Sequence, residues 1–192
     1  MTRDEAIRLI YQKSNNLASL PQEFRNDRDI VKIAIQQNPQ SYIYASSELL
    51  ADKELALYAI SLGFNRLPML DDKLLADKEL ILKIMPKLSY NPHFLEQISD
   101  TLQDDPDITY EYVKRDPEFI RNISSKFYSN IDFIIRLLSE DIVEIARYVR
   151  ENDQLKVFRQ VPGYVSKVPL ELLTLKVRQE FAAYLDLGEI GL

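Results

Sequence analysis

The chain has 192 residues, of which 46% are hydrophobic and 28% charged, and its formal net charge is −6. This balance is typical of a folded globular protein and excludes an intrinsically disordered chain. The absence of cysteine excludes disulfides and thiolate chemistry, and the small number of glycines, 4, argues against a strand-rich fold. The acidic balance argues against direct nucleic-acid binding, which needs a basic face.

From the N-terminal residues we expect no secretory signal. Asp4 and Glu5 stand where such a signal would have basic and then apolar residues. No stretch of the sequence reaches the apolar length of a membrane span. We therefore expect a cytoplasmic protein, of the producing cell or of a host that it enters, with no membrane partner.

Six helix starts are predicted along the chain from one recurring pattern. Each begins with a side chain that can accept hydrogen bonds from the free amides of a first helical turn, and an acid follows two positions later, where the helix dipole favours negative charge. The six starting residues are Thr2, Asp27, Asp52, Asp77, Asp105 and Asn130. Their spacings are 25, 25, 25, 28 and 25 residues.

A helix of about ten residues is predicted after each start, because apolar residues such as Val31, Ala34 and Ile35 recur with helical spacing. A breaker such as Asn38-Pro39 ends it, and a shorter second helix follows with inward residues three apart, from Tyr42 and Ala45 to Ile145 and Tyr148. An apolar residue, called a plug residue here, lies three positions before each predicted helix start after the first. The plug residues are Phe24, Leu49, Leu74, Leu102 and Phe127.

Self-similarity with this period predicts an all-α fold, a right-handed type of α-solenoid with about six helix pairs of about 25 residues each. The tandem units occupy residues 2–150, and residues 151–192 are expected to form a C-terminal helical cap. Within this cap we expect a helix over 152–160, a turn at Pro162-Gly163 and a longer helix over 169–186. The 28-residue spacing reflects an insertion, Leu88-Ser89-Tyr90, in one turn.

The segment from Ala45 to Leu55, with Ser46, Leu49, Asp52, Glu54 and Leu55 in a pattern echoed before Leu80, resembles a bacterial and protist family of tandem helical repeats known only as a domain of unknown function. The resemblance covers residues 17–135. It implies a helical repeat fold and no particular chemistry. Tetratricopeptide and ankyrin repeats fit worse, because their periods are longer and their signature residues are missing from this sequence.

The sequence offers no catalytic, cofactor-binding or metal-binding residue. Paired acids such as Asp52 and Glu54 resemble acid–base or metal pairs, but their recurrence at every predicted helix start favours capping. The acidic stretch from Asp100 to Asp107 is interpreted as a solvated loop rather than a weak cation site. His93, the single histidine, is expected on the surface, because no nucleophile or orienting partner can be named for it.

Apolar residues at predicted outward positions are the strongest functional signal. Later units carry charged or polar residues at these positions, such as Lys83, Glu111 and Arg136. The apolar positions, together with two residues of the insertion, form the predicted partner-binding set: Ile33, Ile43, Tyr44, Tyr58, Met69, Leu88 and Tyr90. Exposed apolar side chains of this kind mark binding surfaces. The competing interpretations are that curvature or the C-terminal tail covers them, or that they carry no function.

We therefore expect a non-enzymatic module that binds a protein partner, as an adaptor, an inhibitor or a host-directed effector. Two alternatives remain open from the sequence: an enzyme of unrecognised type with a carboxylate-lined concave groove, and an acidic mimic of nucleic acid.

Overall fold

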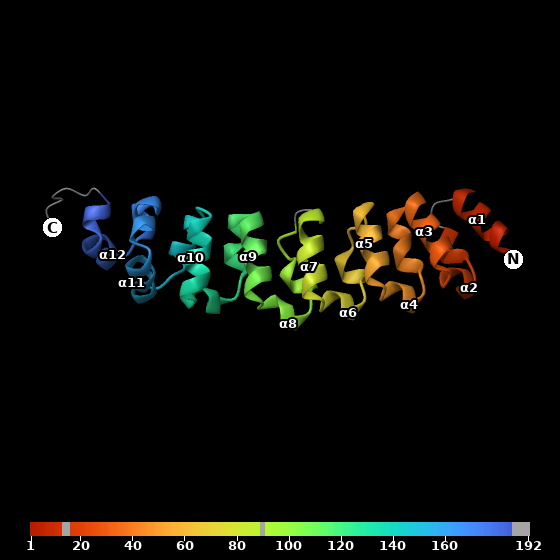
Figure 1. The fold of residues 1–192 in the computed structure, drawn as a ribbon, viewed down its shortest axis with the longest axis horizontal. Coiled ribbons are helices and arrows are strands. Elements are labelled where there is room, and N and C mark those ends of the chain that lie inside the picture. Colours follow the sequence, from red (N-terminus) through yellow and green to blue (C-terminus); the bar gives the residue numbers. More distant parts are fainter. Residues whose placement is uncertain (13–15, 89–90, 186–192) are drawn as a thin grey trace. The chain divides into compact units, whose positions relative to one another are not determined.

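The computed structural model describes residues 1–12, 16–88 and 91–185, and every element in these ranges is an α-helix or a 3₁₀-helix (Figure 1). The predicted all-helical class is confirmed. The chain divides into two compact units, unit 1 with residues Met1–Gln103 and unit 2 with residues Asp104–Leu192. Within the described ranges, no helix combines the length and the apolar character needed to cross a membrane.

Unit 1 repeats one order of elements, a longer α-helix, a 3₁₀-helix and a single-turn α-helix, with one additional 3₁₀-helix after the fourth longer helix. The longer helices are α1 (Arg3–Gln12), α3 (Arg28–Gln37), α5 (Lys53–Ser61) and α7 (Lys78–Ile84). The 3₁₀-helices are η1 (Asn16–Ser19), η2 (Pro39–Tyr44), η3 (Leu67–Met69), η4 (Met85–Lys87) and η5 (Leu95–Gln97). The single-turn helices are α2 (Gln22–Arg25), α4 (Ser47–Leu50), α6 (Asp72–Leu75) and α8 (Asp100–Gln103). Each longer helix packs against the next one along the chain.

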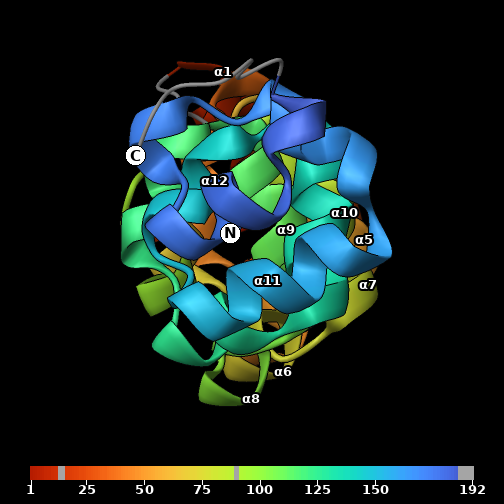
Figure 2. The ribbon, with the colours of Figure 1, turned by 90° about the vertical axis from the view of Figure 1, so that its left-hand side faces the viewer.

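Unit 2 begins with a similar order. Its α-helices are α9 (Pro106–Arg115), α10 (Ile131–Ser139), α11 (Glu151–Gln160) and α12 (Leu175–Glu180). Its 3₁₀-helices are η6 (Pro117–Asn122), η7 (Ser125–Ser129), η8 (Val143–Arg147), η9 (Pro162–Lys167), η10 (Leu170–Leu172) and η11 (Ala182–Tyr184). Helix α10 packs against both α9 and α11, and α11 also packs against α12. Figure 2 looks onto the end of the chain where α11 and α12 lie.

The predicted helix starts are confirmed in both units. Asp52 accepts a hydrogen bond from the backbone N–H of Leu55 at 2.8 Å, and Asp77 accepts one from Leu80 at 2.9 Å. The side chains of Asp27, Asp105 and Asn130 cap their helices in the same way. At Thr2 the cap is reciprocal, because the Thr2 hydroxyl accepts from the Glu5 N–H while the Glu5 carboxylate accepts from the Thr2 N–H.

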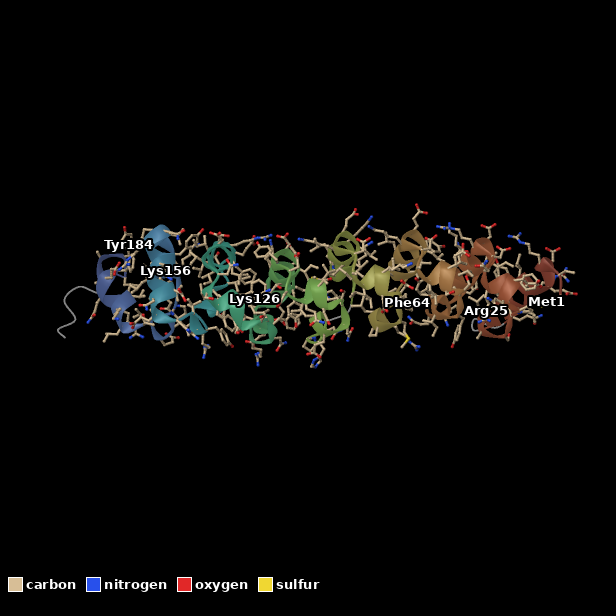
Figure 3. The ribbon with its side chains drawn as sticks, turned by 90° about the horizontal axis from the view of Figure 1, so that it is seen from below. Met1, Arg25, Phe64, Lys126, Lys156 and Tyr184 are labelled. Carbon is tan, nitrogen blue, oxygen red and sulfur yellow. The ribbon has the colours of Figure 1, made fainter. Side chains whose placement is uncertain are left out.

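The predicted inward residues of the longer helices form the core. Val31, Ala34 and Ile35 of α3 are fully buried, and the five plug residues are buried as well. Phe64 lies in the interior of unit 1 (Figure 3), where its ring meets that of Tyr42 edge-on with centroids 5.1 Å apart. The Tyr42 hydroxyl donates to the Leu50 carbonyl at 2.6 Å, so its polar tip is satisfied inside the core.

A ladder of ion pairs, the cap ladder, connects consecutive helix starts in unit 1. The basic residue that follows each cap reaches the capping acid of the next helix and the acid two positions beyond it. Lys53, for example, lies 2.9 Å from both Asp77 and Glu79. The other two rungs join Arg3 to Asp27 and Asp29, and Arg28 to Asp52 and Glu54. Since these groups are partly or largely exposed, each pair adds little stability.

One sequence prediction is made more precise by the structure, and another is wrong in detail. The predicted second helix is a 3₁₀-helix, and in most repeats a separate helical turn follows it. In the tail, the helix expected over 169–186 is broken: Leu173 and Thr174 are extended, and they separate η10 from α12. Buried Gln154 explains the break, because its amide donates to the Leu172 carbonyl at 2.9 Å and its carbonyl accepts from the Thr174 N–H at 3.0 Å. Residue 186, the predicted end, lies outside the described residues.

Candidate functional site

The predicted outward positions of unit 1 lie on two kinds of element. Ile33 and Tyr58 belong to α3 and α5, whereas Ile43 and Tyr44 belong to η2 and Met69 to η3. Met69 is 53% exposed, and the other four side chains are half-buried. These five residues are named the N-terminal apolar surface. The Lys32 ammonium lies 5.9 Å from the centre of the Tyr58 ring, so a cation sits at the edge of this surface.

The corresponding positions later in the chain face solvent. Lys83, Glu111 and Arg136, which correspond to Ile33 and Tyr58, are all exposed. Stacking of the helices does not therefore require an apolar residue at this position. The partial exposure of Ile33 and Tyr58 leaves apolar area available to a partner.

The insertion contributes less to a surface than the sequence suggests. Leu88 is 8% exposed and belongs to the core, so its assignment as a partner-binding residue needs correction. Leu88 is the residue directly after η4, a short 3₁₀-helix that begins at Met85. At this position its apolar side chain is buried. Tyr90 lies outside the described residues.

The paired acids act in the way that capping predicts. Hydrogen bonds from the Leu80 backbone and the Lys53 side chain hold the pKa of Asp77 below its ordinary value. The Arg3 guanidinium, with the backbone amides of the first turn of α3, likewise lowers the pKa of Asp27. A carboxylate held ionised in this way is a poor general acid or base at neutral pH. Within the described residues, no group of three or more His, Asp or Glu side chains is arranged to hold a metal ion.

His93 and the stretch from Asp100 to Asp107 are engaged in local contacts. His93 is exposed, and its Nδ1 lies 3.1 Å from the Glu96 carboxylate. Asp100 accepts from the Gln103 amide, Asp104 pairs with Lys126 at 3.0 Å and Asp107 pairs with Arg136 at 2.8 Å. These acids therefore belong to helix ends and surface ion pairs.

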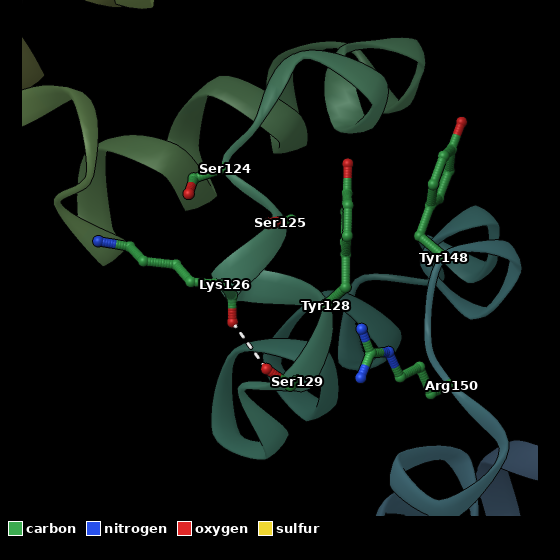
Figure 4. Close-up of a pocket in the computed structure, with 7 residues that line it drawn as sticks. All are labelled: Ser124, Ser125, Lys126, Tyr128, Ser129, Tyr148 and Arg150. Carbon is green, nitrogen blue, oxygen red and sulfur yellow. Dashed lines mark hydrogen bonds between the residues drawn. The ribbon is translucent and has the colours of Figure 1, made fainter.

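A pocket in unit 2 was not predicted. It has a volume of about 500 Å³ and is lined by Ser124, Ser125, Lys126, Tyr128, Ser129, Tyr148 and Arg150. We name it the tyrosine pocket. The rings of Tyr128 and Tyr148 stack with their centroids 5.1 Å apart and their planes at 21° (Figure 4). Burial, and then the proximity of Tyr148, raises the pKa of Tyr128, whose hydroxyl donates to the Ile120 carbonyl at 2.8 Å.

The two cations of the tyrosine pocket differ in their surroundings. Lys126 extends away from the tyrosine pair, and its ammonium is neutralised by Asp104. Arg150 extends toward the base of Tyr128 (Figure 4), and no acidic side chain pairs with it in the part of the chain that the structure describes. Among the described residues, the lining therefore carries one unpaired cation, Arg150, and no acid.

A second hollow of about 340 Å³ shares Tyr148 with the tyrosine pocket. Its lining mixes charges, with Glu118 and Glu144 beside Arg121 and Arg147. Arg121 pairs with Glu118 one helical turn away. Unlike the tyrosine pocket, this hollow is lined by acids as well as bases.

The sequence assigned Tyr148 to the core, and this assignment is wrong. Tyr148 is half-exposed, and Val149 is buried at 5% exposure beside it. No short helix separates η8 from α11, whereas one lies between the corresponding elements of the earlier helix pairs. The chain therefore leaves the regular register here, and Tyr148 is only partly buried. The only sequence signal for the pocket was the short distance along the chain from the start of α10 to the start of α11.

Comparisons with known proteins give one match. A family model described as a domain of unknown function (DUF4116) matches residues 3–50 and 77–128. A search of curated proteins and a search of solved structures found no match.

Proposed function

The chain belongs to the family described as a domain of unknown function, DUF4116, and we propose that it is a non-enzymatic module that binds a protein partner. The N-terminal apolar surface makes the contact. The module serves as an adaptor, an inhibitor or a host-directed effector, and it acts in the cytoplasm.

The observation that carries this proposal is the exposure of Met69 on η3, next in the repeat pattern to half-buried Tyr44 on η2. A methionine that is 53% exposed has no packing role that the fold requires. At the corresponding positions, η5 and η6 carry Gln97 and Asn122. Methionine and tyrosine are enriched in the cores of protein interfaces, because they offer large contact area and adapt to a partner.

We further propose that the chain is a right-handed α-solenoid of about six helix pairs, each about 25 residues long, with residues 151–192 as a C-terminal cap. Two observations support this architecture. The two family matches begin at Arg3 and Asp77, which lie at or beside predicted helix starts. Inside each unit, consecutive longer helices pack against each other.

An enzyme with a carboxylate-lined groove and an acidic nucleic-acid mimic are the weaker proposals. Both would use acids such as Asp52 and Asp77. These side chains already accept backbone hydrogen bonds and form rungs of the cap ladder. Their spacing follows from helix stacking and not from the geometry of a substrate or of a phosphate backbone.

The test is affinity capture from the native cell with quantitative mass spectrometry. Two double variants divide the surface, Tyr44→Gln with Met69→Gln and Ile33→Lys with Tyr58→Lys. A third, Leu175→Gln with Tyr184→Gln, is the control, because it removes exposed apolar side chains outside the surface.

We expect the free energy of unfolding of each variant to lie within about 0.5 kcal/mol of the wild-type value, as is usual for surface substitutions. At least one surface variant should lose a captured protein that the control retains. If both surface variants capture the same proteins in the same ratios as the control, the proposal is wrong.

A further inference from the structure

We propose, building on the proposed function, that the protein partner of the N-terminal apolar surface presents an acidic side chain to Lys32 and Tyr58. Unit 2 contains the corresponding pair of residues together with the acids that complete it, whereas unit 1 contains the pair alone.

A cation and an aromatic ring meet at the same two positions in both units. These positions are the fifth residue after one predicted helix start and the sixth residue after the next. In unit 1 they hold Lys32 and Tyr58, with the ammonium 5.9 Å from the ring centre. In unit 2 they hold Tyr110 and Arg136, with the guanidinium 3.5 Å from the ring centre. In each unit, two neighbouring helices therefore present these positions on a common face.

In unit 2, acidic side chains complete the pair. Arg136 pairs with Asp107 at 2.8 Å. The Tyr110 hydroxyl donates to the Glu140 carboxylate at 2.7 Å. Lys114, whose ammonium lies 5.7 Å from the centre of the Tyr110 ring, donates to the same Glu140 oxygen at 2.9 Å. Hydrogen bonds from Lys114 and then from Tyr110 lower the pKa of Glu140, so this carboxylate is ionised at neutral pH. A tyrosine hydroxyl and an ammonium group near its ring can therefore share one carboxylate.

The acids that would complete the pair are missing from unit 1 or already engaged. Asp29, the counterpart of Asp107, pairs with Arg3 at 3.1 Å in the cap ladder. The C-cap residue of α10 is Glu140, whereas the C-cap residue of α5 is Leu62. Leu62 is 44% exposed. An exposed leucine therefore stands where unit 2 carries its shared carboxylate.

Lys32 and Tyr58 consequently keep unused hydrogen-bonding capacity. In the part of the chain that the structure describes, no acid pairs with the Lys32 ammonium, and the Tyr58 hydroxyl makes no hydrogen bond. Both side chains are half-buried, and a charge-assisted hydrogen bond gains strength where water is partly excluded. Leu62 lies one helical turn after Tyr58, so an apolar side chain next to the partner's acid would gain contact area there.

Peptides selected from a random twelve-residue library test this proposal. The library is offered to the immobilised full chain in the presence of excess dissolved Lys32→Glu protein, which removes every peptide that binds elsewhere. We expect the surviving peptides to share an Asp or Glu next to an apolar residue. A parallel selection with dissolved Lys73→Glu protein is the matched control, because Lys73 is an exposed lysine of α6, and it should leave no survivors.

The affinity of a surviving peptide for a set of variants locates the carboxylate. Replacing the acid of the peptide by its amide should weaken binding about tenfold, the loss of a charge-assisted contact. Tyr58→Phe, which keeps the ring and removes only the hydroxyl, should weaken binding about threefold. Leu62→Glu should weaken it about tenfold or more, because it supplies inside the chain the carboxylate that Glu140 supplies in unit 2. Leu62→Gln, which adds no charge, should have a smaller effect. Far-UV circular dichroism of each variant reports whether its fold is intact.

The proposal is overturned if no peptide survives the Lys32→Glu competitor, if the survivors share no acid, or if Leu62→Glu and Leu62→Gln weaken binding equally in folded proteins. These results leave the proposed function standing, because that proposal is decided by capture from the native cell. A captured protein that is lost with the Ile33→Lys and Tyr58→Lys double variant but retained by Lys32→Gln would support the proposed function and overturn the acidic contact.

Discussion

Replacing Gln154 by leucine should destabilise unit 2 more than any surface change. Gln154 lies on α11 with 3% of its surface exposed, and its side chain makes three hydrogen bonds to backbone groups. Its amide donates to the Ala146 carbonyl at 2.7 Å and to the Leu172 carbonyl at 2.9 Å, and its carbonyl accepts from the Thr174 N–H at 3.0 Å. One side chain therefore joins η8, α11 and the extended segment before α12.

The magnitude follows from these three contacts. Leucine nearly preserves the volume but leaves three backbone groups without their partner, and each such hydrogen bond contributes about 1 kcal/mol net. Gln154→Leu should therefore lower the free energy of unfolding by about 3 kcal/mol. Urea unfolding followed by far-UV circular dichroism measures this change, and Gln160→Leu, an exposed glutamine of the same helix, is the matched control. A loss below about 0.5 kcal/mol, the range of ordinary surface changes, would refute the role given to Gln154.

Three further predictions concern the caps, the turns and the insertion. Asp77→Ala should cost about 1 kcal/mol through loss of a helix cap. Because the folded pKa of Asp77 is lowered, this contribution is complete above the ordinary pKa of 3.8 and is lost as the pH falls below it, so urea unfolding of the two proteins should converge in acid. Asp141, the one non-glycine residue with positive φ in the described ranges (59°), should tolerate glycine within about 0.5 kcal/mol, whereas Asp141→Val should lose at least about 1 kcal/mol in thermal unfolding. Leu88→Ala should cost about 2 kcal/mol or more by urea unfolding, and a neutral result would place Leu88 on the surface after all.

The sequence was sufficient to predict the helix starts and the core, because both depend on local chemistry. A capping side chain acts on amides two or three residues away, as Asp52 does on Leu55, and the inward residues of α3 follow from helical periodicity. The plug residues could be predicted for the same reason, since they recur at a fixed distance from each cap.

The contacts between segments could not be predicted from the same patterns. The cap ladder joins residues 24 to 26 positions apart, as in Arg3 with Asp27 and Asp29. Predicting these ion pairs would have required the distance between neighbouring helices, which the sequence pattern does not contain. The interruption at Thr174 depends on the amide of Gln154, which lies 20 residues earlier. Tyr148 was assigned to the core because its spacing from Ile145 matched the earlier segments. The structure shows Tyr148 only partly buried, with Val149 buried beside it, and no helical turn between η8 and α11.

The most direct test of the proposed binding role is photo-crosslinking from the N-terminal apolar surface. A benzoylphenylalanine is introduced in place of Met69 and, as a control, in place of Leu175, which is also an exposed apolar residue but lies in unit 2. The proteins are irradiated in the native cell, and their adducts are compared by mass spectrometry. Our account predicts a defined protein adduct at position 69 that is missing at position 175. No adduct at position 69, or the same adducts at both positions, would contradict it.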